Sequence, residues 1–233
     1  MIKDLFSLRE EEIFKTLREL KGCNFVVIGG YAVNAYALPR FSVDCDIVVK
    51  NEKELKNIEE ILLKIGYKRE NTHEEAQYSG RFSRYGKKLD NNFMVSMDIL
   101  IKNVADRMTK TVFSADWVFE NSKIRALKGK TINEELNMRI INIDALLAMK
   151  IVSCRSTDIR DIFMMLPNAN STEWIKSEVS LRYNFKNRLS KIAEKVTSKQ
   201  FKDGLSGVYG YFDQKTFEKH RKAVLSLQDS KTL

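Results

Sequence analysis

The sequence predicts an α/β (α+β) fold, in which a mixed β-sheet with flanking helices is followed by a C-terminal helical domain. Three observations lead to this prediction. Short apolar runs bounded by glycine, typical of buried strands, alternate with helical patterns over residues 22–66. Strand-like patterns continue to about residue 132. Only helical patterns follow residue 142, so we expect two domains, over residues 1–140 and 141–233.

The predicted elements of the first domain are justified by their end signals as well as by their apolar patterns. Ser7 with Glu10 has the pattern of a capping box at a helix start, and Asn51 with Glu54 repeats it. Gly66 stands where that second helix should end. The expected elements are, in order, a helix from Ser7 to Gly22, a strand at 25–28, a helix at 31–38, a strand at 45–49, a helix at 51–65, strands at 78–85 and 93–101, and a hairpin at 124–132.

The second domain is predicted to be helical and basic. Its expected helices are at residues 143–154, 157–166, 173–197 and 214–227. The chain has 40 Lys and Arg against 31 Asp and Glu, a net charge of +9, which favours anionic partners. Residues 171–233 hold 13 basic and 7 acidic residues, so +6 of that charge lies there. Two interpretations of this basic segment remain, an RNA-binding surface or ordinary solvated helix faces. The basic positions are Arg182, Lys186, Arg188, Lys191, Lys195, Lys199 and Lys202.

Composition excludes several classes of protein. The 233 residues, 43% hydrophobic and 30% charged, are typical of a globular chain. No stretch approaches the ~20 apolar residues of a membrane span, and three cysteines without C-x-x-C spacing fit neither a zinc motif nor a secreted disulfide scaffold. Two distant histidines disfavour a histidine metal site or a His-centred triad. We expect a cytoplasmic protein with no membrane partner, whose chemistry depends on carboxylates.

The pair Gly29-Gly30 is a candidate phosphate-binding turn. It lies between a predicted strand and a predicted helix, where glycine allows close backbone approach and helix N–H groups attract anions. A plain tight turn is the alternative. Arg40 and Ser42, a few residues further on, are polar neighbours of the next strand.

Three aspartates are candidate metal ligands. Asp44 and Asp46 are two residues apart at a strand start, so their carboxylates share a face and repel each other unless a cation such as Mg²⁺ or Mn²⁺ neutralises them. Two solvated aspartates are the alternative. Asp98 lies within an apolar strand, where a buried carboxylate needs a partner. We predict that its strand lies beside that of Asp44 and Asp46 and that all three converge on metal. The alternative is that Asp98 pairs with a buried arginine or caps a neighbouring backbone segment.

Lys150 is the candidate cation of the helical domain. It lies within an apolar helical stripe, so it either extends to solvent or binds an anion, which is a phosphate or the carboxylate of Asp158 or Asp161 on the next helix. The spacing does not choose between the two aspartates.

These residues together resemble the polymerase-β-type nucleotidyltransferase superfamily. The resemblance covers about residues 24–101, with Gly29-Gly30, the segment from Arg40 to Asp46, and Asp98. Within the superfamily, the chain is most similar to AbiE-type, toxin-like nucleotidyltransferases, whose Leu-x-x-x-Lys and Arg-x-x-Asp-x-x-Asp motifs match residues 146–161. One departure is Gly30, where many members have serine. The resemblance implies that Asp44, Asp46 and Asp98 bind metal and are catalytic. It also implies that the nucleotide-binding residues are Gly29, Gly30, Arg40, Ser42, Lys150, Asp158 and Asp161.

The resemblance implies a reaction in which an acceptor hydroxyl attacks the α-phosphorus of an NTP and releases pyrophosphate. Mg²⁺ or Mn²⁺ would be the cofactor and the NTP a co-substrate. The acceptor is RNA or tRNA bound through the basic C-terminal helices, a protein, or a small molecule as in antibiotic nucleotidyltransferases. A non-catalytic NTP-binding or antitoxin-like module of the same fold is the alternative function.

Overall fold

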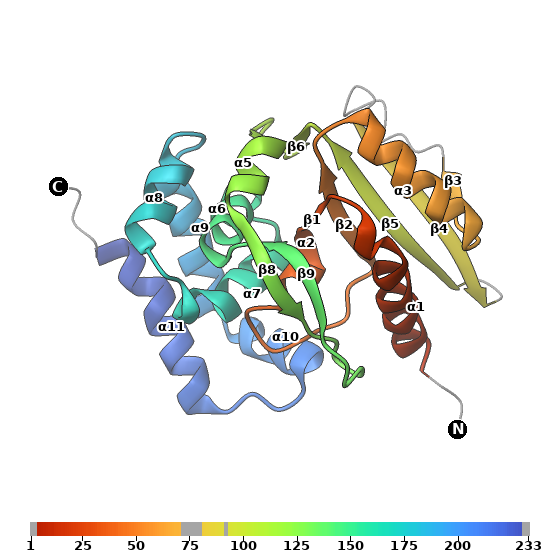
Figure 1. Ribbon diagram of the computed structural model, residues 1–233. Coiled ribbons are helices and arrows are strands. Elements are labelled where there is room, and N and C mark those ends of the chain that lie inside the picture. The colour runs from red at the N-terminus through yellow and green to blue at the C-terminus, as the bar shows by residue number, and fades with distance from the viewer. Residues whose placement is uncertain (1–3, 71–80, 91–92, 230–233) are drawn as a thin grey trace. The chain divides into compact units, whose positions relative to one another are not determined.

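A computed structural model describes residues 4–70, 81–90 and 93–229. The chain divides into two compact units. The first holds residues 1–35, 39–107 and 112–142, and the second holds residues 36–38, 108–111 and 143–233. Strands and helices mix in the first unit, whereas helices dominate the second, which confirms the predicted fold class (Figure 1).

The first unit is built on a mixed seven-stranded sheet with the order β3-β4-β5-β2-β1-β9-β8. Strand β2 is parallel to β5 and antiparallel to β1, while β1 is parallel to β9. The outer pairs, β3 with β4, β4 with β5, and β8 with β9, are antiparallel. The strands are β1 (Val26–Val27), β2 (Asp44–Val49), β3 (Lys68–Glu70), β4 (Phe82–Asp90), β5 (Phe93–Ile101), β8 (Ser122–Leu127) and β9 (Leu136–Ile141). A separate two-stranded sheet pairs β6 (Asn103–Ala105) with β7 (Val112–Ser114).

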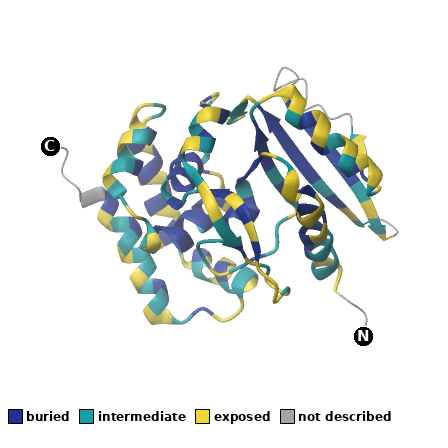
Figure 2. Cartoon of the chain, viewed as in Figure 1, coloured by how far each residue is buried: buried dark blue, intermediate teal, exposed yellow. Residues whose placement is uncertain are grey.

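Burial explains why the central strands are apolar. Both β2 and β5 are buried over most of their length, with polar residues confined to the start of β2 and to one face of β5 (Figure 2). Helices α1 (Leu5–Glu19) and α3 (Glu52–Lys64) pack on β5 and bury Ile13, Phe14, Leu17, Ile58 and Leu62 (Figure 1). Among the described residues, the other helical segments of this unit are η1 (Leu20–Gly22), α2 (Gly29–Val33) and α5 (Ala115–Glu120).

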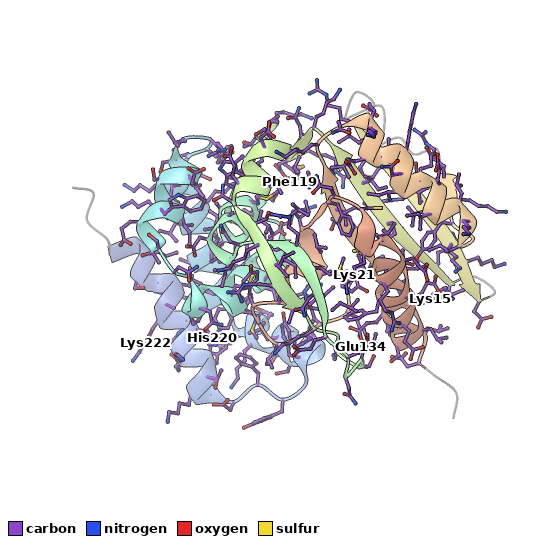
Figure 3. The ribbon with its side chains drawn as sticks, in the orientation of Figure 1. Lys15, Lys21, Phe119, Glu134, His220 and Lys222 are labelled. Carbon is purple, nitrogen blue, oxygen red and sulfur yellow. The ribbon has the colours of Figure 1, made fainter. Side chains whose placement is uncertain are left out.

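The second unit is a group of helices around an aromatic core. The helices are α6 (Ile143–Ser153), α7 (Ser156–Met165), η2 (Leu166–Asn168), α8 (Thr172–Ser180), α9 (Phe185–Thr197), α10 (Lys199–Tyr209) and α11 (Gln214–Asp229). Phe163 of α7 lies at the centre of this core, within 5.4 Å, between ring centroids, of Phe201, Phe217 and His220. His220 of α11, labelled in Figure 3, packs against this core, and its Nδ1 lies 2.9 Å from the Phe163 carbonyl oxygen. No helix among the described residues is long and apolar enough to cross a membrane.

Some predicted elements differ from the structure for identifiable reasons. Helix α1 begins after Asp4, whose side chain accepts the Phe6 N–H, so Ser7 is not its cap. Glu10 is buried instead, and its carboxylate accepts the backbone N–H groups of Lys130 and Thr131. The predicted hairpin at 124–132 has the wrong bounds: its strands are β8 and β9, which pair antiparallel on either side of a longer connection, part of which Glu10 holds.

The other differences concern boundaries and short elements. The long helix predicted at 173–197 is two helices, because Asn184 caps a new start by accepting the Asn187 N–H. Strands β3, β6 and β7 and helices α5 and α10 were not expected. Of the strand predicted at 78–85, residues 78–80 lie outside the described residues. The short helix predicted at 31–38 begins two residues earlier, at Gly29, and ends at Val33.

Candidate active site

Three aspartates from two neighbouring parallel strands come together on one face of the sheet. In the pairing of β2 with β5, Asp46 stands opposite Asp98 and Asp44 opposite Ser96. One carboxylate oxygen from each of Asp44, Asp46 and Asp98 lies within 4.8 Å of the others. The predicted pairing of the two strands is confirmed. We call these three residues the acidic triad.

The donors of the acidic triad suit a hard divalent cation. Three carboxylates at this spacing repel one another, and oxygen ligands are those that Mg²⁺ and Mn²⁺ prefer. Asp98 is buried, whereas Asp44 and Asp46 are partly exposed, so the group is reachable from solvent on the side of β2. The residues present therefore fit a bound cation.

Gly29 lets the backbone pass directly against the acidic triad. Its φ of +63° is in the left-handed region, and a Cβ at this position would lie 1.9 Å from Oδ2 of Asp46. The neighbouring Ile28 N–H donates to the Asp46 carbonyl at 3.0 Å. Glycine at position 29 is thus required by both conformation and space.

Gly30 brings Arg40 and Ser42 to the same turn. A Cβ on Gly30 would lie 2.2 Å from the Ser42 Oγ and 3.4 Å from an Arg40 Nη. Arg40 is buried, its backbone is held by two hydrogen bonds with the Asn34 side chain, and its Nη1 donates to the Phe41 carbonyl at 3.0 Å. Helix α2 has only five residues, so the polar side chains at this turn, more than a helix dipole, provide the positive and hydrogen-bonding groups.

Asp98 has an arginine partner in addition to its place in the acidic triad. Arg84 of β4 donates to both oxygens of Asp98, from Nε at 2.7 Å and from Nη2 at 2.6 Å. The two interpretations of Asp98, convergence with the other aspartates and pairing with an arginine, are both found. Arg84 was not predicted, because only the register between β4 and β5, which places it opposite Asp98, shows the pairing.

Lys150 pairs with both aspartates that the sequence left as alternatives. Its Nζ lies 3.1 Å from Asp158 and 2.8 Å from Asp161, and the three side chains are 9%, 4% and 0% exposed. Asp158 also accepts from the backbone N–H and the Nε of Arg155. These residues belong to the second unit, where they form a buried ion cluster between α6 and α7.

Cys45 lies between the two aspartates of β2 in the chain but faces the core. Burial, followed by the charges of Asp46 and Asp44, raises the pKa of the Cys45 thiol well above its ordinary value. The residue therefore stays a neutral thiol, and it is neither a thiolate nucleophile nor a metal ligand.

A cavity of ≈ 470 Å³ in the first unit has different chemistry from the acidic triad. It is lined by Lys21 (labelled in Figure 3), Gly22, Cys23, Asn24, Phe25, Ile124, Asn137, Met138 and Arg139. None of these is a carboxylate, and none is a predicted site residue.

Comparison with solved structures identifies the fold. The chain is similar to MenT4, a nucleotidyltransferase toxin from Mycobacterium tuberculosis H37Rv, with a TM-score of 0.60 and 12% identity over 98% of this chain and 85% of that one. A protein from H. pylori described as a candidate nucleotidyltransferase matches with a TM-score of 0.47 and 15% identity, over 95% of this chain and 94% of that one. None of the curated proteins matches.

The sequence as a whole identifies the family. The family model described as "Nucleotidyl transferase AbiEii toxin, Type IV TA system" matches residues 14–229, which cover most of both units and include every predicted site residue. With the fold and the geometry of the acidic triad, this match leads to one conclusion: the chain belongs to the AbiEii family of nucleotidyl transferase toxins.

Proposed function

We propose that this chain is a metal-dependent nucleotidyltransferase that transfers an NMP from an NTP to an acceptor hydroxyl, with release of pyrophosphate. The observation that carries the proposal is the acidic triad, three carboxylates within 4.8 Å beside a glycine turn that only glycine can form. Carboxylates this close repel one another and destabilise the fold unless a bound cation neutralises their charge. Membership of a family of nucleotidyltransferase toxins gives the reaction class.

Asp44, Asp46 and Asp98 would hold the cations. When bound, Mg²⁺ or Mn²⁺ supplies activation of the acceptor hydroxyl and stabilisation of charge on the triphosphate. Asp44 and Asp46, which are partly exposed, would hold the cations from the solvent-accessible side of the acidic triad. Asp98, fixed by Arg84, would hold its oxygens beside the attacking hydroxyl.

The nucleotide phosphates would be bound by the glycine turn and by cations. Ser42 and Arg40 lie against Gly30, so they are the hydrogen-bonding groups at that turn and would replace the serine that this chain lacks at position 30. Lys150 would bind the triphosphate, and Asp158 and Asp161, which both contact it, would orient its ammonium group.

RNA or tRNA is the acceptor that the second unit favours. On α9 and the start of α10, Lys186, Lys191, Lys195 and Lys199 are exposed and recur at nearly helical spacing. This arrangement suits a polyanion better than a cationic small molecule. Two other basic residues have structural partners: Arg182 pairs with Glu178 at 2.6 Å, and the buried Arg188 lies 4.2 Å from the Tyr183 ring centre.

The proposal is tested by incubating the protein with each α-labelled NTP, Mg²⁺ and cellular RNA, protein or small-molecule fractions. We expect label in the RNA fraction with native protein, and its loss with Asp44→Asn/Asp46→Asn. Asp116→Asn, an exposed aspartate of α5 whose partner is Lys50, is the matched control and should label normally. Native protein that binds NTP but labels nothing would favour the alternative, a non-catalytic NTP-binding module. Label in the protein or small-molecule fraction would contradict the RNA acceptor.

A further inference from the structure

Arg84 occupies one end of a row of paired residues that crosses the acidic triad. The register places Arg84 of β4 opposite Asp98 of β5, and Asp98 opposite Asp46 of β2. Side chains opposite one another on neighbouring strands lie on the same face of a sheet. The arginine therefore approaches Asp98 from the side away from Asp44 and Asp46.

The contact between Arg84 and Asp98 is strong and specific. The guanidinium donates to both carboxylate oxygens, at 2.7 and 2.6 Å, and the side chains are 25% and 5% exposed. A bidentate pair of this kind fixes the orientation of the carboxylate as well as its charge. Each oxygen keeps further lone pairs, so Asp98 can bind a cation without losing the arginine.

We propose that Arg84 is a positioning residue that acts as an internal counter-cation of the acidic triad. It holds Asp98 ready before a divalent cation binds, and its charge weakens the binding of that cation, so Arg84 sets the metal affinity of the site. This inference rests on the proposed function, because it takes the acidic triad to be the metal site.

Arg84 should have opposite effects on the metal-free and the metal-bound protein. Without Arg84, the repulsion among the three carboxylates increases, and a bound cation relieves it. Loss of the charge should therefore lower the melting temperature in EDTA and strengthen cation binding. A positive charge a few ångströms from a divalent ion changes its affinity on the order of tenfold at the dielectric of bulk water and by more at that of a partly buried site, so about tenfold is the smallest change expected.

The experiment measures Mn²⁺ binding by calorimetry, and melting temperature in EDTA and in Mn²⁺, for native protein, Arg84→Met, Arg84→Gln and Arg84→Lys. We expect both neutral variants to bind Mn²⁺ at least about tenfold more tightly, and Mn²⁺ to raise their melting temperature by more than it raises that of native protein. Arg84→Lys keeps the positive charge but loses the bidentate contact with Asp98. Its Mn²⁺ affinity should stay within about threefold of native, while its kcat falls and its KM for NTP does not change.

Lys87→Met is the matched control, because Lys87 lies on the same strand and forms a partly buried pair with Glu12 at 2.7 Å. Lys87→Met should lower the melting temperature by the same amount in EDTA and in Mn²⁺. Equal or weaker Mn²⁺ binding by both neutral variants would overturn the proposal. Arg84→Met could unfold in EDTA, in which case refolding on addition of Mn²⁺ would support the proposal. Arg84→Gln with the Mn²⁺ affinity of native protein would contradict the proposal.

The Mn²⁺ titration separates this inference from the proposed function. If native protein binds Mn²⁺ and Asp44→Asn/Asp46→Asn does not, while no fraction accepts label, the transfer reaction fails and the role of Arg84 stands. If native protein transfers NMP and the neutral Arg84 variants bind Mn²⁺ as native does, the role of Arg84 fails alone.

Discussion

Two ionic clusters in the described part of this protein differ in their balance of charge. In the first unit, three carboxylates converge and Arg84 pairs with one of them. In the second unit, Lys150 lies between two carboxylates, Arg155 adds a further cation to Asp158, and Arg160 adds one to Asp161. Excess negative charge calls for a metal ion, whereas buried carboxylates that already have cationic partners do not, and removing such a partner is costly.

This difference separates two kinds of contribution to the proposed reaction. The acidic triad should lower the stability of the metal-free protein and take part directly in the proposed reaction. The Lys150 cluster should instead stabilise α6 and α7 before any ligand binds. Substitutions in the two clusters should therefore change stability in opposite directions.

The largest effect is expected from Lys150→Met. It leaves the carboxylates of Asp158 and Asp161 buried without their shared ammonium, which costs about 3–5 kcal/mol of unfolding free energy. Denaturant unfolding measures this loss. Lys128→Met, which breaks an exposed pair with Glu135, should change stability by less than about 1 kcal/mol. Equal stabilities of the two variants would contradict the structural role of Lys150.

Asp44→Asn/Asp46→Asn should abolish most of the activity without lowering the stability of the metal-free protein. Transfer activity should fall about 10²–10³-fold, because the charge stabilisation at the phosphates is lost. The melting temperature in EDTA should stay the same or rise, since carboxylate repulsion is relieved. Initial rates and thermal unfolding on one preparation give both values. A melting temperature well below that of native protein would show that the two aspartates stabilise the fold instead.

Gly29→Ala should damage the acidic triad through the backbone. The added methyl group would meet Asp46 and occupy a left-handed conformation, which together cost about 1–3 kcal/mol. Gly22→Ala is the matched control, because nothing lies within 4 Å of a Cβ there. The unfolding free energies of both variants check this expectation, and a Gly29→Ala protein as stable as Gly22→Ala would contradict the tight contact.

Removal of three exposed lysines of α9 should weaken RNA binding without affecting the acidic triad. For Lys186→Ala/Lys191→Ala/Lys195→Ala we expect about tenfold lower affinity at moderate salt and a shallower dependence on salt concentration. Fluorescence anisotropy with labelled RNA measures both. Asp203→Asn, in an acidic position of α10, serves as a charge-change control. An unchanged salt dependence in the triple variant would exclude this face as the RNA surface.

The smallest effect concerns pH and His220. Burial in the aromatic core lowers the pKa of His220, with the positive charge of Lys219 acting in the same direction and the Phe163 carbonyl opposing it. Its neutral form is thus favoured on folding. The stability this contributes is present above the unfolded pKa of about 6.5 and is lost as pH falls through the lower folded pKa. His220→Gln should flatten stability between pH 7 and 5, and an unaltered pH profile would contradict this.

The sequence predicted what depends on local pattern and missed what depends on pairing. Strand alternation and the cost of a buried carboxylate were enough to place Asp98 beside Asp44 and Asp46. Arg84 was missed, because its importance comes from the register with β5 and from no pattern around it. The hairpin around Gly129 was misplaced for a similar reason, since the distant Glu10 fixes that connection.

Lys150 shows the same limit in the second unit. Its place in an apolar stripe left two alternatives, extension to solvent or contact with an anion, and the spacing to α7 offered Asp158 and Asp161 equally. Only the packing of α6 on α7 shows that one ammonium group contacts both carboxylates.

The most direct test of the central claim is a crystal structure with Mn²⁺ and a non-hydrolysable NTP, using the anomalous signal of manganese. We expect an anomalous peak about 2.1 Å from oxygens of Asp44, Asp46 and Asp98, with the triphosphate beside Gly29-Gly30. Manganese bound elsewhere, with the three carboxylates contacting only protein and water, would contradict it.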